Sequence, residues 1–177
     1  QGLPSHLKYE SDGGPGVEEV MGLLRGSAHP REDQQTFFKA LLYFWLLAAI
    51  DGHAKNFSLA IAPGGVFKLA PLYDVLSAWP WQGSGAQQIH KRNIRMAMAL
   101  RTKNAHYHMN DIYRRHWLAV GERFIGLEAT TAILDEISVR AERAISIVQE
   151  KLPEDFPVQV ADAIFAGIKS NLARLAL

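Results

Sequence analysis

The longest apolar segment of the chain runs from Ala40 to Ile50 without a charged residue and stops abruptly at a polar group, residues 51–58. Upstream of it, from about Asp33, apolar and polar residues alternate with the spacing of an amphipathic helix. The end of the segment is apolar on every side, which is typical of a buried helix. We therefore predict one helix from about Asp33 to Ile50, which holds the polar residues after it in a fixed place.

A β-hairpin is predicted directly after this polar group. The apolar runs 57–61 and 66–69 are separated by the sequence Ala-Pro-Gly-Gly, and apolar residues bounded by Pro and Gly are a hairpin signal. The second run is followed closely by a second polar residue, Asp74. Because a hairpin reverses the chain, we expect Asp74 to lie near Asn56.

The remaining segments are mostly helical, so the fold class expected is mainly α with a small β-hairpin (α+β). Residues 94–100 fit either a strand or a helix, and their pattern does not decide between the two. Apolar residues recur at helical spacing in four further stretches, which are Val17 to about Arg25, Asp111 to Phe124, Ala132 to Val148 and Val158 to Leu177.

Two loops carry residue types that could bind a ligand. Residues 8–16 contain three glycines and a proline, which permit close approach of the backbone. Their order differs from the nucleotide-loop pattern Gly-x-x-x-x-Gly-Lys-Ser, so we expect an ordered turn. The loop 78–86 contains Trp79 and Trp81, which could dock a partner or a substrate, but which we expect to cover the core.

Composition excludes several classes of protein. The 177 residues are 48% hydrophobic, which suffices for one sizeable core, and the absence of cysteine excludes disulfides and thiolate zinc sites. No signal-peptide pattern is found, and the apolar run is shorter than the roughly 20 residues that span a bilayer. We therefore expect a cytoplasmic protein with no membrane association. Because the sequence opens with Gln1, we also expect it to be a fragment.

The net charge of +1 hides a basic block at residues 90–116. This block contains seven Lys and Arg residues, four His residues and a single acid, Asp111. A basic block attracts phosphates, acidic partners or nucleic acid, although a solvated surface would give the same count.

Asp51, Asn56 and Asp74 have the order of a phosphoryl-transfer site. An Asp followed five residues later by an Asn is the catalytic-loop spacing of protein kinases, in which the Asp orients the attacking hydroxyl and the Asn binds a metal. A second Asp beyond a hairpin supplies the other metal ligand in the same order of parts. We therefore predict that the three side chains meet around Mg²⁺ and a nucleotide phosphate.

Each of these residues also has a purely structural interpretation. Asp51 and Asn56 could be turn residues, and Asp74 could cap a helix that follows it. His53 could be a structural imidazole, and Lys55 a solvent-exposed cation.

Three segments carry a resemblance to a known family. They are Lys8-Tyr9-Glu10-Ser11-Asp12-Gly13-Gly14-Pro15-Gly16, Asp51-Gly52-His53-Ala54-Lys55-Asn56-Phe57-Ser58 and Leu69-Ala70-Pro71-Leu72-Tyr73-Asp74-Val75-Leu76-Ser77. They resemble the C-terminal part of HipA, the serine/threonine kinase toxin of bacterial HipBA toxin–antitoxin modules. The resemblance implies a kinase-like C-terminal lobe with a helical extension. The lobe core would span residues 1–105, and residues 106–177 would form its C-terminal helical region.

The resemblance also implies a role for each residue of the predicted site. Asp51 corresponds to the catalytic base, and Asn56 and Asp74 correspond to the ligands of Mg²⁺. The residues that correspond to the ATP site are His53, Ala54, Lys55, Asn56, Tyr73 and Asp74. Members of this family phosphorylate a translation component such as an aminoacyl-tRNA synthetase, which leads to growth arrest and persistence. Their partner is HipB, a helix-turn-helix antitoxin, and the pair binds operator DNA.

Other functions stay open at this point. The N-terminal lobe of the family, with its phosphate loop and ATP-pairing lysine, is not found in the 177 residues, so we expect this polypeptide alone to be a poor or inactive kinase. The order Asp-x-His-x-x-Asn also fits a phosphoinositide-type lipid kinase, and the lobe could instead be a non-catalytic module for a repressor or DNA. A metal hydrolase would use Asp51 and His53 with His106 or His108, but the chain lacks a His-x-x-x-His pair.

Overall fold

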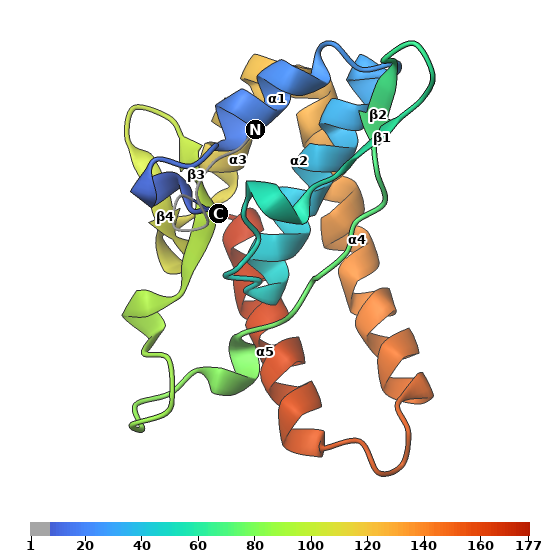
Figure 1. Cartoon of the computed structure of the whole chain (residues 1–177). Helices are drawn as coiled ribbons and strands as arrows, with labels where there is room; N and C mark the ends of the chain where they lie inside the picture. The colour runs from blue at the N-terminus through green and yellow to red at the C-terminus, as the bar shows by residue number, and fades with distance from the viewer. Residues whose placement is uncertain (1–7) are drawn as a thin grey trace.

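The helix α2 (Pro30–Leu47) runs through the centre of the fold, and the other elements pack around it (Figure 1). The computed structural model describes residues 8–177. The other helices are α1 (Val17–Leu24), α3 (Arg114–Ile125), α4 (Leu127–Lys151) and α5 (Val158–Leu175). The strands are β1 (Leu59–Ile61), β2 (Phe67–Leu69), β3 (Arg95–Arg101) and β4 (Ala105–His108). The predicted α+β class with mainly helical content is confirmed.

Aromatic packing joins α2 to the C-terminal helices. Trp45 of α2 is completely buried, and its indole N–H donates to the carbonyl of Met109 at 2.9 Å. Trp117 of α3 meets the rings of both Trp45 and Phe38 edge-on, with centroids 5.7 Å apart. The predicted central helix is therefore the core of the fold, as its all-round apolar pattern indicated.

The prediction that this helix continues to Ile50 is wrong, because it ends at Leu47. Ala48 adopts a left-handed conformation with φ of 50° and breaks the helix. The free carbonyls of the last turn are satisfied by side chains from distant parts of the chain, so the helix can end inside the core. These donors are Trp79 Nε1 to Leu46 at 2.8 Å, Ser77 Oγ to Leu47 at 2.6 Å and Asn171 Nδ2 to Trp45 at 2.7 Å.

The predicted hairpin is present as β1 and β2, which pair antiparallel with Leu59 opposite Leu69. Gly64 and Gly65 both have positive φ, at 85° and 82°, which explains why glycine occupies the turn. Beyond β2 the chain forms no helix between residues 70 and 78. Asp74 is therefore not a helix cap.

The undecided segment 94–100 is a strand. It forms β3 and pairs antiparallel with β4, with an irregular register between Arg95 and Leu100. The five central residues of β3 are all buried, because α1, α3, β4 and the N-terminal turn contact the strand. A strand that is covered on both faces shows no clean apolar–polar alternation.

The glycine-containing stretch 8–16 is an ordered turn around a short 3-10 helix, Glu10–Asp12. The Glu10 carboxylate accepts hydrogen bonds from the Ala99 amide at 2.6 Å and from Arg101 Nε at 2.5 Å, which fixes the turn on β3. A Cβ at Gly16 would lie 2.5 Å from the Glu10 carboxyl carbon, so this position requires glycine.

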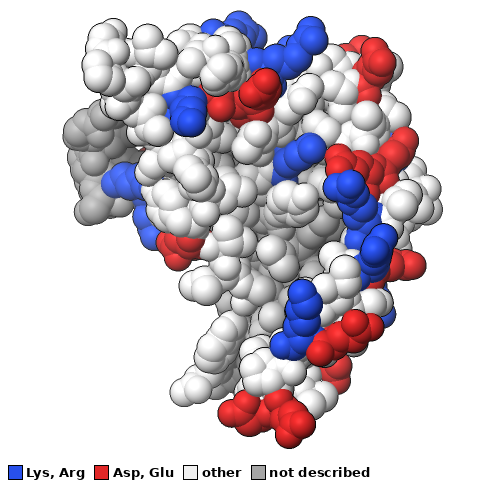
Figure 2. Space-filling view, turned by 90° about the vertical axis from the view of Figure 1, so that its right-hand side faces the viewer, with Lys and Arg blue, Asp and Glu red and all other residues white. Residues whose placement is uncertain are grey.

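The α4–α5 pair extends beyond the main core as a helical hairpin (Figure 1). Its far end has a small core of its own, formed by Ile145, Ala161 and Phe165. Charged side chains of both signs alternate on the face of the molecule toward α4 (Figure 2). The proposed division at residue 105 falls at the start of β4 and stays a prediction. None of the helices within residues 8–177 is long and apolar enough to cross a membrane.

Candidate active site

The loop after α2 is held against the core by close packing. The Ala49 amide donates to the Phe44 carbonyl at 2.8 Å, and Gly52 is buried directly against the Phe44 ring. A Cβ at Gly52 would lie only 2.3 Å from Phe44 Cδ2. The absence of a side chain at Gly52 therefore lets the loop approach the helix and fixes the position of Asp51.

Asn56 connects the two acidic residues of the predicted site. It is 5% exposed and lies in a short 3-10 helix, Ala54–Asn56. Its Nδ2 donates to the main-chain carbonyl of Asp51 at 3.1 Å and to the Asp74 carboxylate at 3.2 Å. The structure thus brings Asp51, Asn56 and Asp74 together across the hairpin.

Asp74 has a strained backbone. Its φ is 56°, and it is one of two non-glycine residues with positive φ within residues 8–177. This conformation costs about 1–3 kcal/mol at a non-glycine residue, although Asp tolerates it better than most. Strain of this kind is common where a side chain must be aimed at a ligand.

Asp51 is held by residues that the sequence did not single out as part of the site. Its Oδ1 accepts hydrogen bonds from Tyr9 Oη at 2.5 Å and from Lys8 Nζ at 3.0 Å, and His53 Nε2 lies 3.6 Å away. Partial burial would raise the pKa of Asp51, but the hydrogen bonds from Tyr9 and Lys8 outweigh it and lower that pKa. The sequence signal for these contacts is that Lys8 and Tyr9 open one of the three segments that carry the family resemblance, directly before the anchored turn at Glu10.

The same contacts keep their donors protonated. The hydrogen bond to Asp51 is the main cause that raises the pKa of Tyr9, and burial adds to it. The hydrogen bonds to Asp51 and Tyr9 raise the pKa of Lys8. Asp51 is therefore an ionised carboxylate with one oxygen fixed by two donors, and its side chain is 54% exposed.

The other predicted nucleotide residues lie beside this group. His53 is buried, its ring meets Tyr9 edge-on at 5.6 Å, and its Nδ1 has no hydrogen-bond partner among residues 8–177. Tyr73 Oη donates to the Lys55 carbonyl at 3.0 Å and lies 2.8 Å from Ser58 Oγ. Ala54 and Lys55 line a mainly apolar pocket of about 400 Å³ between α1 and the first hairpin. Their predicted contact with ATP stays a prediction.

The donor set fits magnesium better than zinc. Asp74 offers a carboxylate and Asn56 an amide oxygen, which are the hard ligands that Mg²⁺ takes. No group of three His, Cys, Asp or Glu side chains with metal-binding geometry exists in the described part of the chain. His106 is already engaged, because its ring stacks on His116 at 4.1 Å and its Nε2 lies 2.9 Å from Thr102 Oγ1.

Internal contacts use part of the charge of the basic block. Arg101 pairs with Glu10, and Arg114 pairs with Asp135 at 2.7 Å. The guanidinium of Arg95 lies over the ring of Tyr107 and that of Arg115 over the ring of Tyr113. The count of basic residues therefore overstates the charge available to a partner.

Comparison with known proteins identifies a family and a relative of the chain. The family model described as HipA-like C-terminal domain matches residues 1–150. The protein named "Putative kinase Y4mE", from Sinorhizobium fredii, is 40% identical over 77 residues, which are 43% of this chain and 18% of that protein.

A likeness in fold extends over nearly the whole chain. A chain in the solved complex of HipA, HipB and operator DNA from Shewanella oneidensis MR-1 matches 98% of this chain, with a TM-score of 0.76 and 22% identity. This chain covers 40% of that one, so it spans less than half the length of either relative. Since the family model matches most of its 177 residues, the chain belongs to the family of the HipA-like C-terminal domain.

Proposed function

We propose that this chain carries the catalytic loop and the metal-binding aspartate of an ATP-dependent serine/threonine protein kinase. The observation that carries the proposal is that Asn56 Nδ2 donates to Asp74 Oδ2 at 3.2 Å and also to the main-chain carbonyl of Asp51. A base, an amide and a second acid from two separate loops are the parts that phosphoryl transfer needs in one place.

Asp51 acts as the base in this proposal. Lys8 and Tyr9 hold its Oδ1, which leaves Oδ2 to accept the proton of the acceptor hydroxyl. As that proton leaves, the hydroxyl oxygen forms a bond to the γ-phosphorus of ATP. The bond from this phosphorus to the bridging oxygen breaks, and ADP departs with the electron pair.

Asn56 and Asp74 would hold the magnesium ion. Because Nδ2 of Asn56 donates to Asp74 and to the Asp51 carbonyl, its Oδ1 is the atom left for a metal. When bound, Mg²⁺ neutralises the negative charge of the phosphates. His53, Ala54, Lys55 and Tyr73 would flank the nucleotide on the other side of this pair.

We further propose that the protein is the toxin of a toxin–antitoxin pair in the cytoplasm. Its protein substrate would be a translation component such as an aminoacyl-tRNA synthetase, and phosphorylation would cause growth arrest and persistence. A HipB-like helix-turn-helix antitoxin would bind it on operator DNA. Family membership supports this assignment, and the fold likeness to the Shewanella HipA–HipB–DNA complex is consistent with it. Co-purification of a helix-turn-helix protein with the tagged full-length protein tests it, and a failure to co-purify would count against it.

Transfer from labelled ATP tests the kinase assignment. The full-length protein is incubated with labelled ATP and Mg²⁺, and protein and lipid products are separated. Asp51→Asn should lower phosphate transfer by orders of magnitude with an unchanged circular dichroism spectrum, because it keeps the shape of the side chain. Asp74→Ala should abolish Mg²⁺-dependent nucleotide binding.

Asp162→Asn, at an exposed acid on α5, is the matched control and should behave as wild type. Transfer by Asp51→Asn at the wild-type rate would contradict the role of the base. A labelled lipid without labelled protein would indicate a lipid kinase.

A further inference from the structure

A second pocket opens beside the loop that carries Asp51. It has a volume of about 220 Å³, and both Asp51 and Asp74 are part of its wall. His53, Lys55, Asn56 and Tyr73 do not line it. A ligand in this pocket would therefore touch the proposed base Asp51 and the proposed metal ligand Asp74, and none of those four other predicted nucleotide residues.

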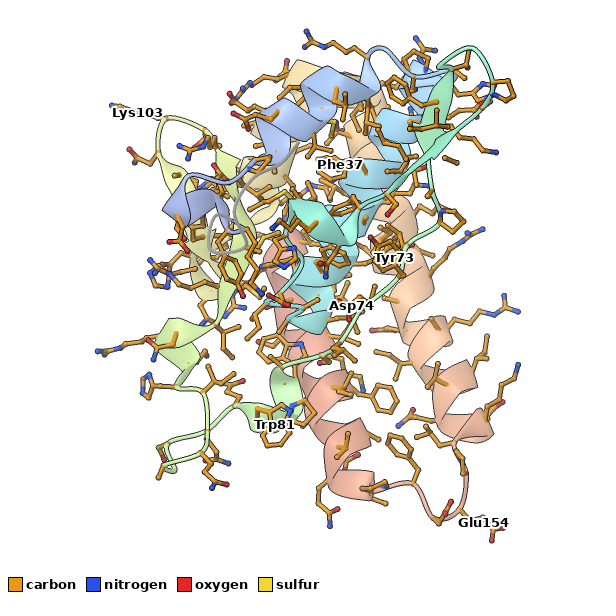
Figure 3. All side chains as sticks on the ribbon, viewed as in Figure 1. Phe37, Tyr73, Asp74, Trp81, Lys103 and Glu154 are labelled. Carbon is orange, nitrogen blue, oxygen red and sulfur yellow. The ribbon has the colours of Figure 1, made fainter. Side chains whose placement is uncertain are left out.

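The rest of the wall is mostly apolar and includes two exposed side chains. Leu76 is 75% exposed and Trp81 is 60% exposed, and both line the pocket together with Ile89. Figure 3 shows Asp74 and Trp81 on the same long segment after the first hairpin. Large apolar side chains that are exposed beside a catalytic carboxylate are typical of a surface that binds a partner.

The chain fixes this wall at several points. Ser77 Oγ donates to the Leu47 carbonyl at 2.6 Å, which ties the segment to the end of α2. The Ile89 amide donates to the Trp81 carbonyl at 2.7 Å, as part of a parallel bridge between Gln82 and Ile89, so Trp81 and Ile89 lie on adjoining segments. The pocket is therefore preformed, which lowers the entropic cost of binding.

The size of the pocket selects the kind of occupant. Pockets for whole small molecules measure about 300–1,000 Å³. A pocket of about 220 Å³ is smaller and suits a single large side chain. In an extended peptide, a residue one or two positions from the serine or threonine that accepts the phosphate lies only about 4–7 Å from that residue. The side chain of such a neighbour can therefore reach this wall.

We propose that this acceptor-side pocket is a specificity subsite, which takes a large apolar side chain within two residues of the phosphorylated serine or threonine. The inference rests on the proposed protein-kinase function. Asp51 meets the acceptor hydroxyl at one end of the pocket, and Leu76, Trp81 and Ile89 hold the neighbouring apolar residue. The substrate class is thus a polypeptide with Leu, Ile, Met or Phe beside the acceptor.

Matched peptides test the subsite. Serine peptides that differ only in Leu, Ala or Asp at each flanking position are phosphorylated by the full-length wild type, Trp81→Ala, Leu76→Ala and the control Val139→Ala. Val139 is 79% exposed on α4, outside the pocket. The wild type and the control should prefer the best Leu peptide over its Ala counterpart by about tenfold or more in kcat/KM, as burial of a large apolar side chain predicts.

Trp81→Ala and Leu76→Ala should lose this preference through a higher KM for the peptide, with the KM for ATP unchanged. The subsite is refuted if the wild type phosphorylates these peptides without any apolar preference, or if both pocket variants keep the preference. Calorimetric binding of the same peptides to Asp51→Asn protein gives a readout independent of turnover. Selective binding of the Leu peptide, together with no phosphate transfer by the full-length wild type, would uphold the pocket and overturn the kinase assignment. Transfer to lipid alone, with no peptide binding, would overturn both the pocket and the protein-kinase assignment.

Discussion

Gly52→Ala tests whether the loop after α2, which carries Asp51, is packed as tightly as the structure shows. The new Cβ would lie 2.3 Å from Cδ2 and 2.7 Å from Cε2 of Phe44. Carbon atoms rest about 3.5–4.0 Å apart, so the ring or the loop must move by more than about 1 Å. Phe44 cannot move freely, because it is 1% exposed and its ring packs 5.6 Å from that of Phe57.

Overpacking of this kind costs about 1–3 kcal/mol. For a chain of this length each kcal/mol lowers the thermal midpoint by about 2–4 °C, so the expected loss is about 2–12 °C. Urea unfolding, followed by tryptophan fluorescence and circular dichroism, measures the free energy directly. The matched control is Gly22→Ala, at an exposed site on α1 where an added Cβ meets nothing within 4 Å. It should stabilise the fold by about 0.5–1 kcal/mol.

A double-mutant cycle then separates packing from other effects of Gly52→Ala. Phe44→Leu removes the ring atoms that the new Cβ would meet, so Gly52→Ala should cost less in the Phe44→Leu background than in the wild type. If Gly52→Ala instead unfolds at the wild-type urea concentration, or costs the same in both backgrounds, the loop does not rest on Phe44. The position assigned to Asp51 would then be wrong.

The remaining predictions concern the core and its dependence on pH. Trp45→Ala should cost about 3–5 kcal/mol and remove the indole hydrogen bond to the Met109 carbonyl, whereas exposed Trp81→Ala should change stability by no more than about 0.5 kcal/mol. Urea unfolding of the two variants distinguishes a buried from an exposed indole. Burial, and then the neighbouring His106, lower the pKa of His116 below its ordinary value of 6.5. Just below pH 6.5 the unfolded chain therefore binds a proton at His116 more readily than the folded protein does. The free energy of unfolding should therefore decrease as pH falls through 6.5, and a decrease that is equally steep in His116→Asn would contradict this.

The sequence predicted those features that depend on local pattern. The apolar period of α2 and the glycines of the first hairpin are local signals, and they were sufficient to place Asn56 and Asp74 on adjoining loops. The end of α2 was missed because it depends on Asn171, whose amide reaches the Trp45 carbonyl across 126 positions. No pattern within a single helix contains that contact.

The surroundings of Asp51 were not predictable for the same reason. Its two donors lie 42 and 43 positions upstream, next to a turn that the bonds of Glu10 to β3 hold in place. The identity of β3 was itself left open, because residues 94–100 alternate mainly between small and larger apolar residues, and burial on both faces removed the apolar–polar alternation that marks a strand with one exposed face. A motif can therefore indicate which residues carry the chemistry, but the orientation of Asp51 follows from Tyr9, Glu10 and β3 acting together. Since Glu10 contacts β3, Glu10→Gln should disturb the Asp51 carboxylate only through the turn, and any such effect should disappear when Lys8 and Tyr9 are both already replaced by Ala.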